Sequence, residues 1–189
     1  MRKLILIKHA KPAVIPEMPS HRWELSQEGQ RQCEPLAGKI RPHLPELVIA
    51  SEEPKAAQTG QILARLLGKP FQTAAGLHEH DRSNVAHIAP RDFLSWMAMF
   101  FQDRQSRAFG KESAAEAEAR ILVAVDDVLA AHPQGNLAVV THGTVLSLLI
   151  AARTGEDPYQ LYRKMALPSY IVFALPDWTV VERAERVIL

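Results

Sequence analysis

Three short runs of the sequence contain only apolar residues, and each run is followed by a segment with helical character. The runs cover residues 4–7, 47–50 and 137–140. Strands that are apolar on both faces are typical of parallel sheets covered by helices on both sides. Their alternation with helices therefore predicts an α/β fold, a three-layer α/β/α sandwich with right-handed crossovers between the strands of a mainly parallel central sheet.

Local signals place the first helices between these strands. Ser26 can accept a hydrogen bond from the first turn of a helix that starts after it. Pro54 suits the first turn and Gly68 the end of a second helix over about 54–67. Both helices lie where a crossover connection between parallel strands requires one.

The second half of the chain continues the pattern and then changes it. Residues 112–132 are rich in alanine and have apolar positions at helical spacing, and a further helix is expected over 145–153. Two later apolar runs, 170–175 and 178–181, are close enough in sequence to form a hairpin. They predict an antiparallel edge to the sheet.

The segment 77–110 interrupts the alternation of strands and helices. It begins as a polar loop and continues as an aromatic-rich helix near 92–102. We interpret it as an insertion that forms a lid over the sheet edge. The whole chain, 1–189, is then a single domain, which agrees with its length of 189 residues and its 47% hydrophobic content.

The charge and hydropathy of the chain limit its partners and its location. The 22 basic and 21 acidic residues nearly cancel, so no nucleic acid and no anionic membrane surface is expected as a partner. No run approaches the ~20 apolar residues of a membrane helix, and no secretion signal is evident. The single cysteine, Cys33, excludes an internal disulfide and fits a cytoplasmic protein in which it is a small buried hydrophobe.

Two histidines follow apolar runs at the point where a strand is expected to end. His9 follows the first run and His142 follows the run at 137–140. The carboxyl ends of parallel strands share one edge of the sheet, and helix N-termini with free N–H groups converge there. The two imidazoles are therefore expected in one site that binds an anion.

Six groups of residues, two of which contain these histidines, follow one another along almost the whole chain. They are Lys8, His9 and Ala10; Leu25, Ser26, Gly29 and Gln32; Ser51, Lys55, Ala56, Gln58 and Thr59; Leu77, His78 and Glu79; Gly110, Glu112, Ser113 and Arg120; and Val140, Thr141, His142 and Gly143. In this order they resemble the signatures of the histidine phosphatases, the phosphoglycerate mutase-like superfamily. The resemblance implies a phosphoglycerate mutase-like fold and a phosphomonoester hydrolase that works through a phosphohistidine intermediate.

The resemblance also assigns the catalytic roles. His9 would attack phosphorus with one ring nitrogen while a backbone carbonyl holds the other. Glu79 would protonate the leaving oxygen and later act as base on water, with Asp81 as the reserve candidate. His142 would donate to the equatorial oxygens of the transferred group. No metal and no organic cofactor is required.

Phosphate binding is where the sequence departs from the family pattern, because lysine replaces both motif arginines. Lys8 and Lys55 keep the charge that a phosphate needs but lose the planar, bidentate fork of a guanidinium. Each replacement is expected to slow the reaction roughly tenfold without abolishing it. Gly143 is a further candidate for phosphate binding, next to His142.

Other side chains are candidates for contacts with the rest of the substrate. Arg22 and Trp23 follow the first strand in an irregular segment, and Arg82 lies just beyond Glu79. The substrate itself is not fixed by the residues: sugar phosphates, phosphoglycerate, a nucleotide-loop precursor and a phosphohistidine protein all remain open. The short chain favours hydrolysis over phosphoglycerate mutase-like transfer. The apolar tail 187–189 could serve a homodimer contact.

Two alternatives to a phosphatase remain open at this stage. The first is a non-catalytic module of the same fold that captures a phosphate ligand without turnover. The second is a metal-dependent hydrolase with ligands among His78, His80 and Asp81, near His87. The aromatic set of Phe93, Trp96, Phe100 and Phe101 is interpreted as the packing face of the lid rather than a ligand platform.

Overall fold

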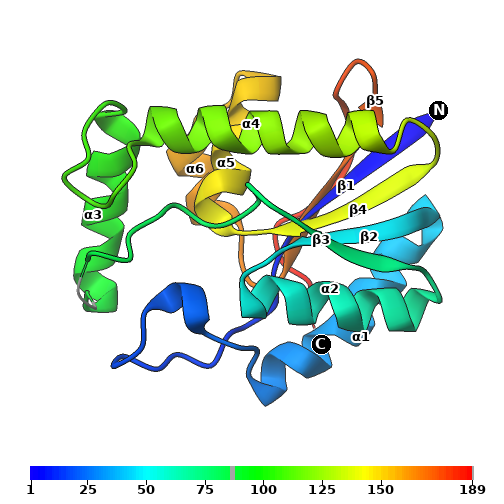
Figure 1. Ribbon diagram of the computed structural model, residues 1–189, viewed down its shortest axis with the longest axis horizontal. Helices are drawn as coiled ribbons and strands as arrows, with labels where there is room; N and C mark the ends of the chain where they lie inside the picture. Colours follow the sequence, from blue (N-terminus) through cyan, green and yellow to red (C-terminus); the bar gives the residue numbers. More distant parts are fainter. Residues whose placement is uncertain (86–87, 189) are drawn as a thin grey trace.

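A computed structural model describes residues 1–85 and 88–188 of the chain. Within these residues, six strands form one sheet in the order β3-β2-β4-β1-β5-β6 (Figure 1). The strands are β1 (Arg2–Lys8), β2 (Pro45–Ser51), β3 (Phe71–Ala74), β4 (Asn136–Thr141), β5 (Ser169–Leu175) and β6 (Thr179–Ala184). The pairs among β1 to β4 are parallel, whereas β5 pairs antiparallel with both β1 and β6. The predicted α/β fold with a mainly parallel sheet and an antiparallel edge is confirmed.

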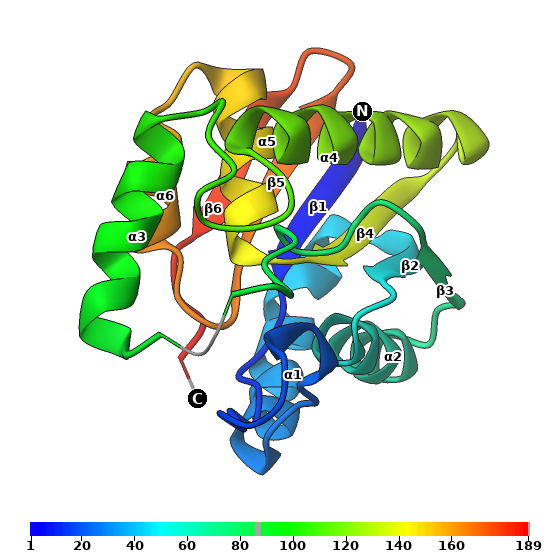
Figure 2. The same ribbon diagram turned by 60° about the vertical axis from the view of Figure 1, so that its left-hand side comes forward.

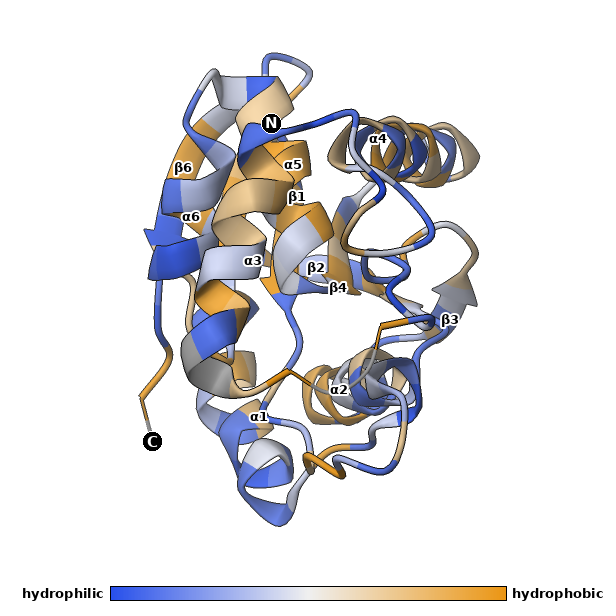
Figure 3. Ribbon diagram, turned by 90° about the vertical axis from the view of Figure 1, so that its left-hand side faces the viewer, coloured by the Kyte–Doolittle hydropathy of each residue, from blue (hydrophilic) through white to orange (hydrophobic). Residues whose placement is uncertain are grey.

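Helices cover both faces of this sheet and produce two separate cores. They are α1 (Gln27–Ile40), α2 (Pro54–Leu67), α3 (Pro90–Gln102), α4 (Ala114–Ala131), α5 (Gly143–Thr154) and α6 (Pro158–Lys164). Ile5 and Ile7 of β1 pack with α1 and α2, whereas Leu4 and Leu6 pack on the other face with α4 and α5. This alternation explains why the strand is apolar throughout. Figure 3 shows β1 and α5 as largely apolar elements at the centre of the fold.

The start of α1 explains the motif of Leu25, Ser26, Gly29 and Gln32. The Ser26 hydroxyl accepts a hydrogen bond from Gly29 N, as predicted for a helix cap. A side chain at Gly29 would collide with the carbonyl oxygen of Lys11, so this glycine allows the chain after β1 to lie directly on the helix. Gln32 accepts a hydrogen bond from Lys11 N and donates to Leu167 O. The motif therefore fixes the segment that follows His9.

Two elements were not predicted. The edge strand β3 has exposed polar residues at Gln72 and Thr73, so it lacks the continuous apolar run of the central strands. The helix α6 has only seven residues, begins at Pro158 and is capped by the Asp157 side chain. Its Leu161 is buried in the core shared with α5, and tertiary packing rather than local pattern stabilises it.

The segment 77–110 lies beyond the carboxyl ends of the strands. Its helix α3 packs beside α6, as Figures 1 and 2 both show, with the Phe101 ring 6.0 Å from the ring of Tyr159. Phe109 follows the helix and stacks on Trp96 with ring centroids 5.5 Å apart. Of the aromatic set that we predicted as a packing face, Phe100 and Phe101 are buried as expected, whereas Trp96 is partly exposed and Phe93 lines the pocket described below.

The tail 187–189, which we predicted as a homodimer contact, is partly buried in the protein itself. In the tail, Val187 is buried in the core on the α1 and α2 side, so it is not free for a dimer contact, whereas Ile188 is exposed and Leu189 lies outside the described residues. Among the helices of the described residues, none has the length and apolar character to cross a membrane.

Candidate active site

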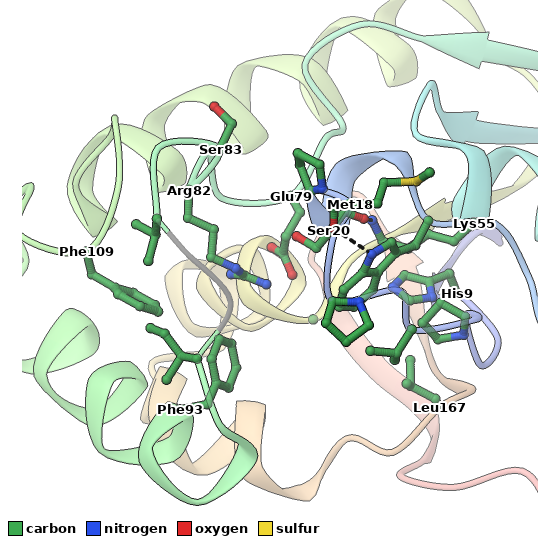
Figure 4. A pocket seen from close by; sticks show the side chains of 18 of the residues that line it. His9, Met18, Ser20, Lys55, Glu79, Arg82, Ser83, Phe93, Phe109 and Leu167 are labelled. Atoms are coloured by element: carbon green, nitrogen blue, oxygen red, sulfur yellow. Dashed lines mark hydrogen bonds between the residues drawn. The ribbon is translucent and has the colours of Figure 1, made fainter.

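A pocket of about 620 Å³ opens beyond the carboxyl ends of β1 and β4 (Figure 4). Seven of the residues predicted to form the site line it among the described residues: Lys8, His9, Trp23, Lys55, Glu79, Arg82 and Gly143. They come from the end of β1, from two loops and from the first turns of α2 and α5. The topology therefore brings them together as expected for the edge of a parallel sheet.

His9 is held in a defined orientation at the end of β1. Its Nδ1 lies 2.7 Å from the Ala10 carbonyl oxygen, and the backbone N–H of Ala10 donates to the Thr59 hydroxyl. A ring whose Nδ1–H donates to a carbonyl carries its lone pair on Nε2. Burial, the charge of Lys55 and then that of Lys8 lower the His9 pKa to about 3, against an opposing effect of the Ala10 hydrogen bond. The imidazole is therefore neutral near pH 7 and can act as a nucleophile.

Both lysines line the pocket, and each already donates a hydrogen bond to a backbone carbonyl. Lys8 Nζ donates to Met165 O at 2.7 Å and lies 5.6 Å from the centroid of the Tyr162 ring. Burial lowers the pKa of Lys8 to about 8, although Glu79 opposes this shift. Lys55 Nζ donates to Ser20 O at 2.8 Å. Both cations are thus held at fixed points of the wall by carbonyl oxygens.

Glu53 is a residue of this site that sequence reasoning missed. Its carboxylate forms an ion pair with Lys55, accepts a hydrogen bond from Glu79 N at 2.8 Å and lies 3.8 Å from His142 Nδ1. Only 11% of its side chain is exposed. The available signal was its position two residues before Lys55, at the start of α2. A phosphate that binds Lys55 must compete with this carboxylate.

Glu79 lies at the N-terminus of α5 and caps it. Its carboxylate accepts hydrogen bonds from His80 N at 2.9 Å, Thr144 N at 3.2 Å and Val145 N at 3.3 Å. Burial favours the neutral acid, but the charge of Arg82 and these backbone donors outweigh it and lower the Glu79 pKa to about 2. Glu79 is therefore ionised in the empty pocket, and a dianion bound beside it would raise its pKa.

Two further residues hold the loop that carries Glu79. The guanidinium of Arg120 donates to Gly76 O at 2.7 Å and to His78 O at 2.9 Å, and it forms an ion pair with Glu112. These residues belong to the late motif predicted from the sequence. Their contacts orient the 76–81 loop rather than the substrate.

His142 lies behind His9 rather than on the pocket surface. It is fully buried, and its ring centroid is 5.1 Å from that of His9. Its Nε2 is 2.9 Å from the Ser51 hydroxyl, whereas its Nδ1 has no hydrogen-bond partner among the described residues. Burial, followed by the charge of Lys55, lowers the pKa of His142 well below its usual value. The ring is therefore a neutral neighbour of the nucleophile.

The remaining candidates for substrate contact differ in position. Trp23 lines the pocket, and its indole N–H donates to the carbonyl oxygens of Ile15 and Met18. Arg82 also lines the pocket, and its buried Nη1 has no hydrogen-bond partner among the described residues. Arg22 is exposed and is not one of the lining residues that are described.

The positions of the described side chains support neither Asp81 as the acid nor the alternative metal site. The Asp81 carboxylate accepts a hydrogen bond from Ser83 N and is not among the described lining residues. His80 packs on Phe100 with ring centroids 4.2 Å apart and has its Nε2 3.0 Å from Glu112 O. His87 lies outside the described residues. Within residues 1–85 and 88–188, no group of three or more histidine, cysteine or acidic side chains could hold a metal ion.

Comparison with known proteins gives one family over nearly the whole chain. The family described as Histidine phosphatase superfamily (branch 1) matches residues 4–178. No curated protein matches the sequence significantly.

Similar solved structures agree with this match at the level of the fold. Bacillus stearothermophilus YhfR has a TM-score of 0.76 and 19% identity, over 95% of this chain and 94% of that chain. A putative alpha-ribazole-5'-P phosphatase from Escherichia coli has a TM-score of 0.73 and 20% identity over 100% of both chains. A mycobacterial glucosyl-3-phosphoglycerate phosphatase in complex with inorganic phosphate has a TM-score of 0.75 and 19% identity, over 92% and 90% of the two chains. At these identities the likeness establishes the shared fold.

Proposed function

The chain belongs to the histidine phosphatase superfamily, branch 1, and on this premise we propose that it hydrolyses small phosphomonoesters through a phosphohistidine at His9. The observation that carries the proposal is the geometry of this one side chain. His9 faces a pocket with Lys8 and Lys55 in its wall, and Ala10 O orients its ring so that Nε2 is free. A neutral, oriented imidazole beside two cations is suited to in-line attack on a phosphoryl group.

The first half of the reaction transfers the phosphoryl group to the protein. His9 Nε2 forms a bond to phosphorus as the bond from phosphorus to the ester oxygen breaks. Glu79, ionised in the empty pocket, takes up a proton when the substrate dianion binds beside it and gives that proton to the leaving oxygen. Lys8, Lys55 and the unpaired Nη1 of Arg82 stabilise the charge on the phosphoryl oxygens.

The second half releases inorganic phosphate. A water molecule attacks the phosphohistidine, and Glu79 accepts one of its protons as the bond between His9 and phosphorus breaks. The protons balance over the whole cycle. Glu79 takes one from solvent as the dianion binds and gives it to the leaving oxygen. It later accepts one from the attacking water and returns it to solvent as phosphate leaves. His142, whose ring centroid lies 5.1 Å from that of His9, would contact the transferred group beside the nucleophile.

Turnover of a chromogenic phosphomonoester by the wild type and by His9→Ala tests the proposal. We expect turnover to fall to background in His9→Ala and to persist in the control His132→Ala, whose ring contacts Gln72 at the far end of α4. Wild-type protein quenched during turnover should carry a phosphoryl group that is stable to base and labile to acid.

Three results would contradict the proposal. Turnover in His9→Ala equal to that of the wild type would show that His9 is not the nucleophile. Binding of phosphate without turnover would indicate the non-catalytic module. Loss of turnover on treatment with a chelator would indicate the metal-dependent alternative, since the proposed steps use only side chains of this chain.

A further inference from the structure

The far half of the pocket differs from its reactive end. Figure 4 shows Phe93 and Phe109 on the side opposite His9 and Lys55, with Arg82 and Glu79 between the two groups. Four residues give this far wall its apolar surface: Val85, Ile88, Phe93 and Phe109. Met18, by contrast, lies beside Lys55 (Figure 4). Arg82 and Ser83 are the polar lining residues next to Val85, so the far wall offers few side-chain partners for the hydroxyl groups of a bound sugar.

The apolar surfaces of the pocket are formed before any ligand binds. Near the reactive end, the indole N–H of Trp23 donates to Ile15 O at 3.0 Å and to Met18 O at 2.9 Å, which fixes the proline-rich segment 12–19. On the other side, the rings of Phe93 and Phe109 lie 5.9 Å apart in an edge-to-face arrangement. An apolar wall that is already in place binds an apolar group without an ordering cost.

The charges of the pocket are sufficient for one phosphate group only. The cations among its described lining residues are Lys8, Lys55 and Arg82. Lys55 is paired with Glu53, and Arg82 lies near Glu79, whose pKa it lowers. A bound phosphate dianion would engage the remaining positive charge. A second acidic group on the substrate would have to share with the phosphate the guanidinium of Arg82, which lies 5.1 Å from the centroid of the Phe93 ring, and would otherwise lie against apolar rings.

We propose that this pocket selects phosphomonoesters of apolar alcohols, either aliphatic chains or aromatic rings, over those of sugars and of alcohols that carry a second acidic group. The inference rests on the proposed function and names its substrate class. A pocket of about 620 Å³ has room for a substantial alcohol beyond the phosphate. Each methylene buried against the far wall is expected to raise kcat/KM about two- to fourfold until the wall is covered.

A series of n-alkyl phosphates, from ethyl through butyl and hexyl to octyl, measures this preference. The leaving alcohols have nearly the same basicity and the esters the same charge, so a rise in kcat/KM with chain length reports burial of the chain. Hexyl phosphate should exceed glucose 6-phosphate and 6-phosphooxyhexanoate by at least about tenfold. Equal values along the series, or faster turnover of the sugar or the acid, would overturn the inference.

Variants of the wall locate the effect. Val85→Ser and Ile88→Ser should flatten the dependence of kcat/KM on chain length, because both residues line the pocket in the segment that leads to Phe93. Leu94→Ser is the matched control, since Leu94 is 47% exposed on α3 and is not among the described lining residues. An unchanged slope in both wall variants would show that the chain binds elsewhere.

Binding of alkylphosphonates separates this inference from the proposed function. If the protein turns over no phosphomonoester, the proposed function fails, and calorimetric titration with ethyl, butyl and hexyl phosphonate still tests the wall. Affinity that rises with chain length in the wild type and less in Ile88→Ser supports the apolar subsite. Affinity independent of chain length refutes it, whatever the outcome for catalysis.

Discussion

The replacement of Lys8 by arginine should move the alkaline limb of the pH profile. Burial lowers the pKa of Lys8 from 10.5 to about 8, so the free enzyme loses this positive charge near pH 8. In Lys8→Arg the charge persists, because arginine does not deprotonate in proteins. The profile of kcat/KM reports ionisations of the free enzyme and free substrate, and is therefore the quantity to measure.

The size of the effect follows from the fraction of Lys8 that is charged. Above pH 8 the charged fraction falls tenfold per pH unit, and kcat/KM should fall with it. The fall should level off at a loss of roughly ten- to a hundredfold, the value of ~1.5–3 kcal/mol for a hydrogen bond to a charged group. The pKa of the nearby Tyr162 is raised to about 12 by burial, so this phenol does not contribute to the limb.

A second limb should have a different origin. The reacting complex holds the substrate dianion together with the proton that Glu79 takes up, so kcat/KM follows the singly protonated free substrate. The second ionisation of this substrate lies near pH 6, whereas the His9 pKa is about 3. Above about pH 6, kcat/KM should therefore fall about tenfold per pH unit, equally in wild type and Lys8→Arg, and the loss of the Lys8 charge should steepen the wild-type fall above pH 8. Stopped assays with butyl phosphate over pH 5–10.5 measure both limbs, and thermal melts confirm that the variant is folded. A wild-type profile flat to pH 10, or an alkaline limb unmoved by Lys8→Arg, would refute the reasoning.

Three further changes test other parts of the structure. Lys8→Met should raise the free energy of unfolding by about 2–3 kcal/mol near pH 7, because a depressed lysine pKa means that the unfolded chain binds the proton more tightly below about pH 10.5. The same variant should lower kcat/KM about ten- to a hundredfold. Urea unfolding at pH 7 and 10 measures the stability, and wild-type stability should rise between pH 8 and 10.5. Arg120→Met should lower kcat about ten- to a hundredfold with a smaller effect on KM, because it frees the loop that positions Glu79. Partial recovery of kcat in Arg120→Lys would support this positioning role, and equal losses of kcat in the two variants would contradict it. Gly29→Ala should lower the free energy of unfolding by ~1–3 kcal/mol, because its methyl group would collide with Lys11 O. The matched change Gly38→Ala in the same helix meets no atom within 4 Å and should raise the free energy of unfolding by up to ~1 kcal/mol. Similar shifts of the melting temperature in the two variants would count against the close approach described for Gly29.

The sequence predicts the central part of this fold better than its periphery. Residues 4–7 and 137–140 are apolar throughout because both faces of β1 and β4 are covered, and this pattern is local. The edge strand β3 is half exposed and its pattern is indistinguishable from a loop. The helix α6 is too short to have a periodic pattern and depends on its packing against α5.

The same distinction holds for the site. His9 and His142 could be placed together because both follow strands that end at the same sheet edge. Glu53 could not be found, because its role depends on the turn between β2 and α2, which brings its carboxylate onto Lys55. The far wall of the pocket was also inaccessible to sequence reasoning. It combines Phe93, in the first turn of α3, with side chains from the irregular segments on either side of this helix, and no local pattern brings them together.

The carbonyl oxygen that receives the Lys8 ammonium belongs to Met165, which is 157 positions further along the chain. During synthesis on the ribosome, the strand that carries the nucleophile emerges first, and its neighbour across the pocket emerges near the end. No early folding intermediate can therefore assemble a working phosphate cradle. A nascent or prematurely terminated chain that lacks the region after α5 should neither capture nor transfer phosphoryl groups.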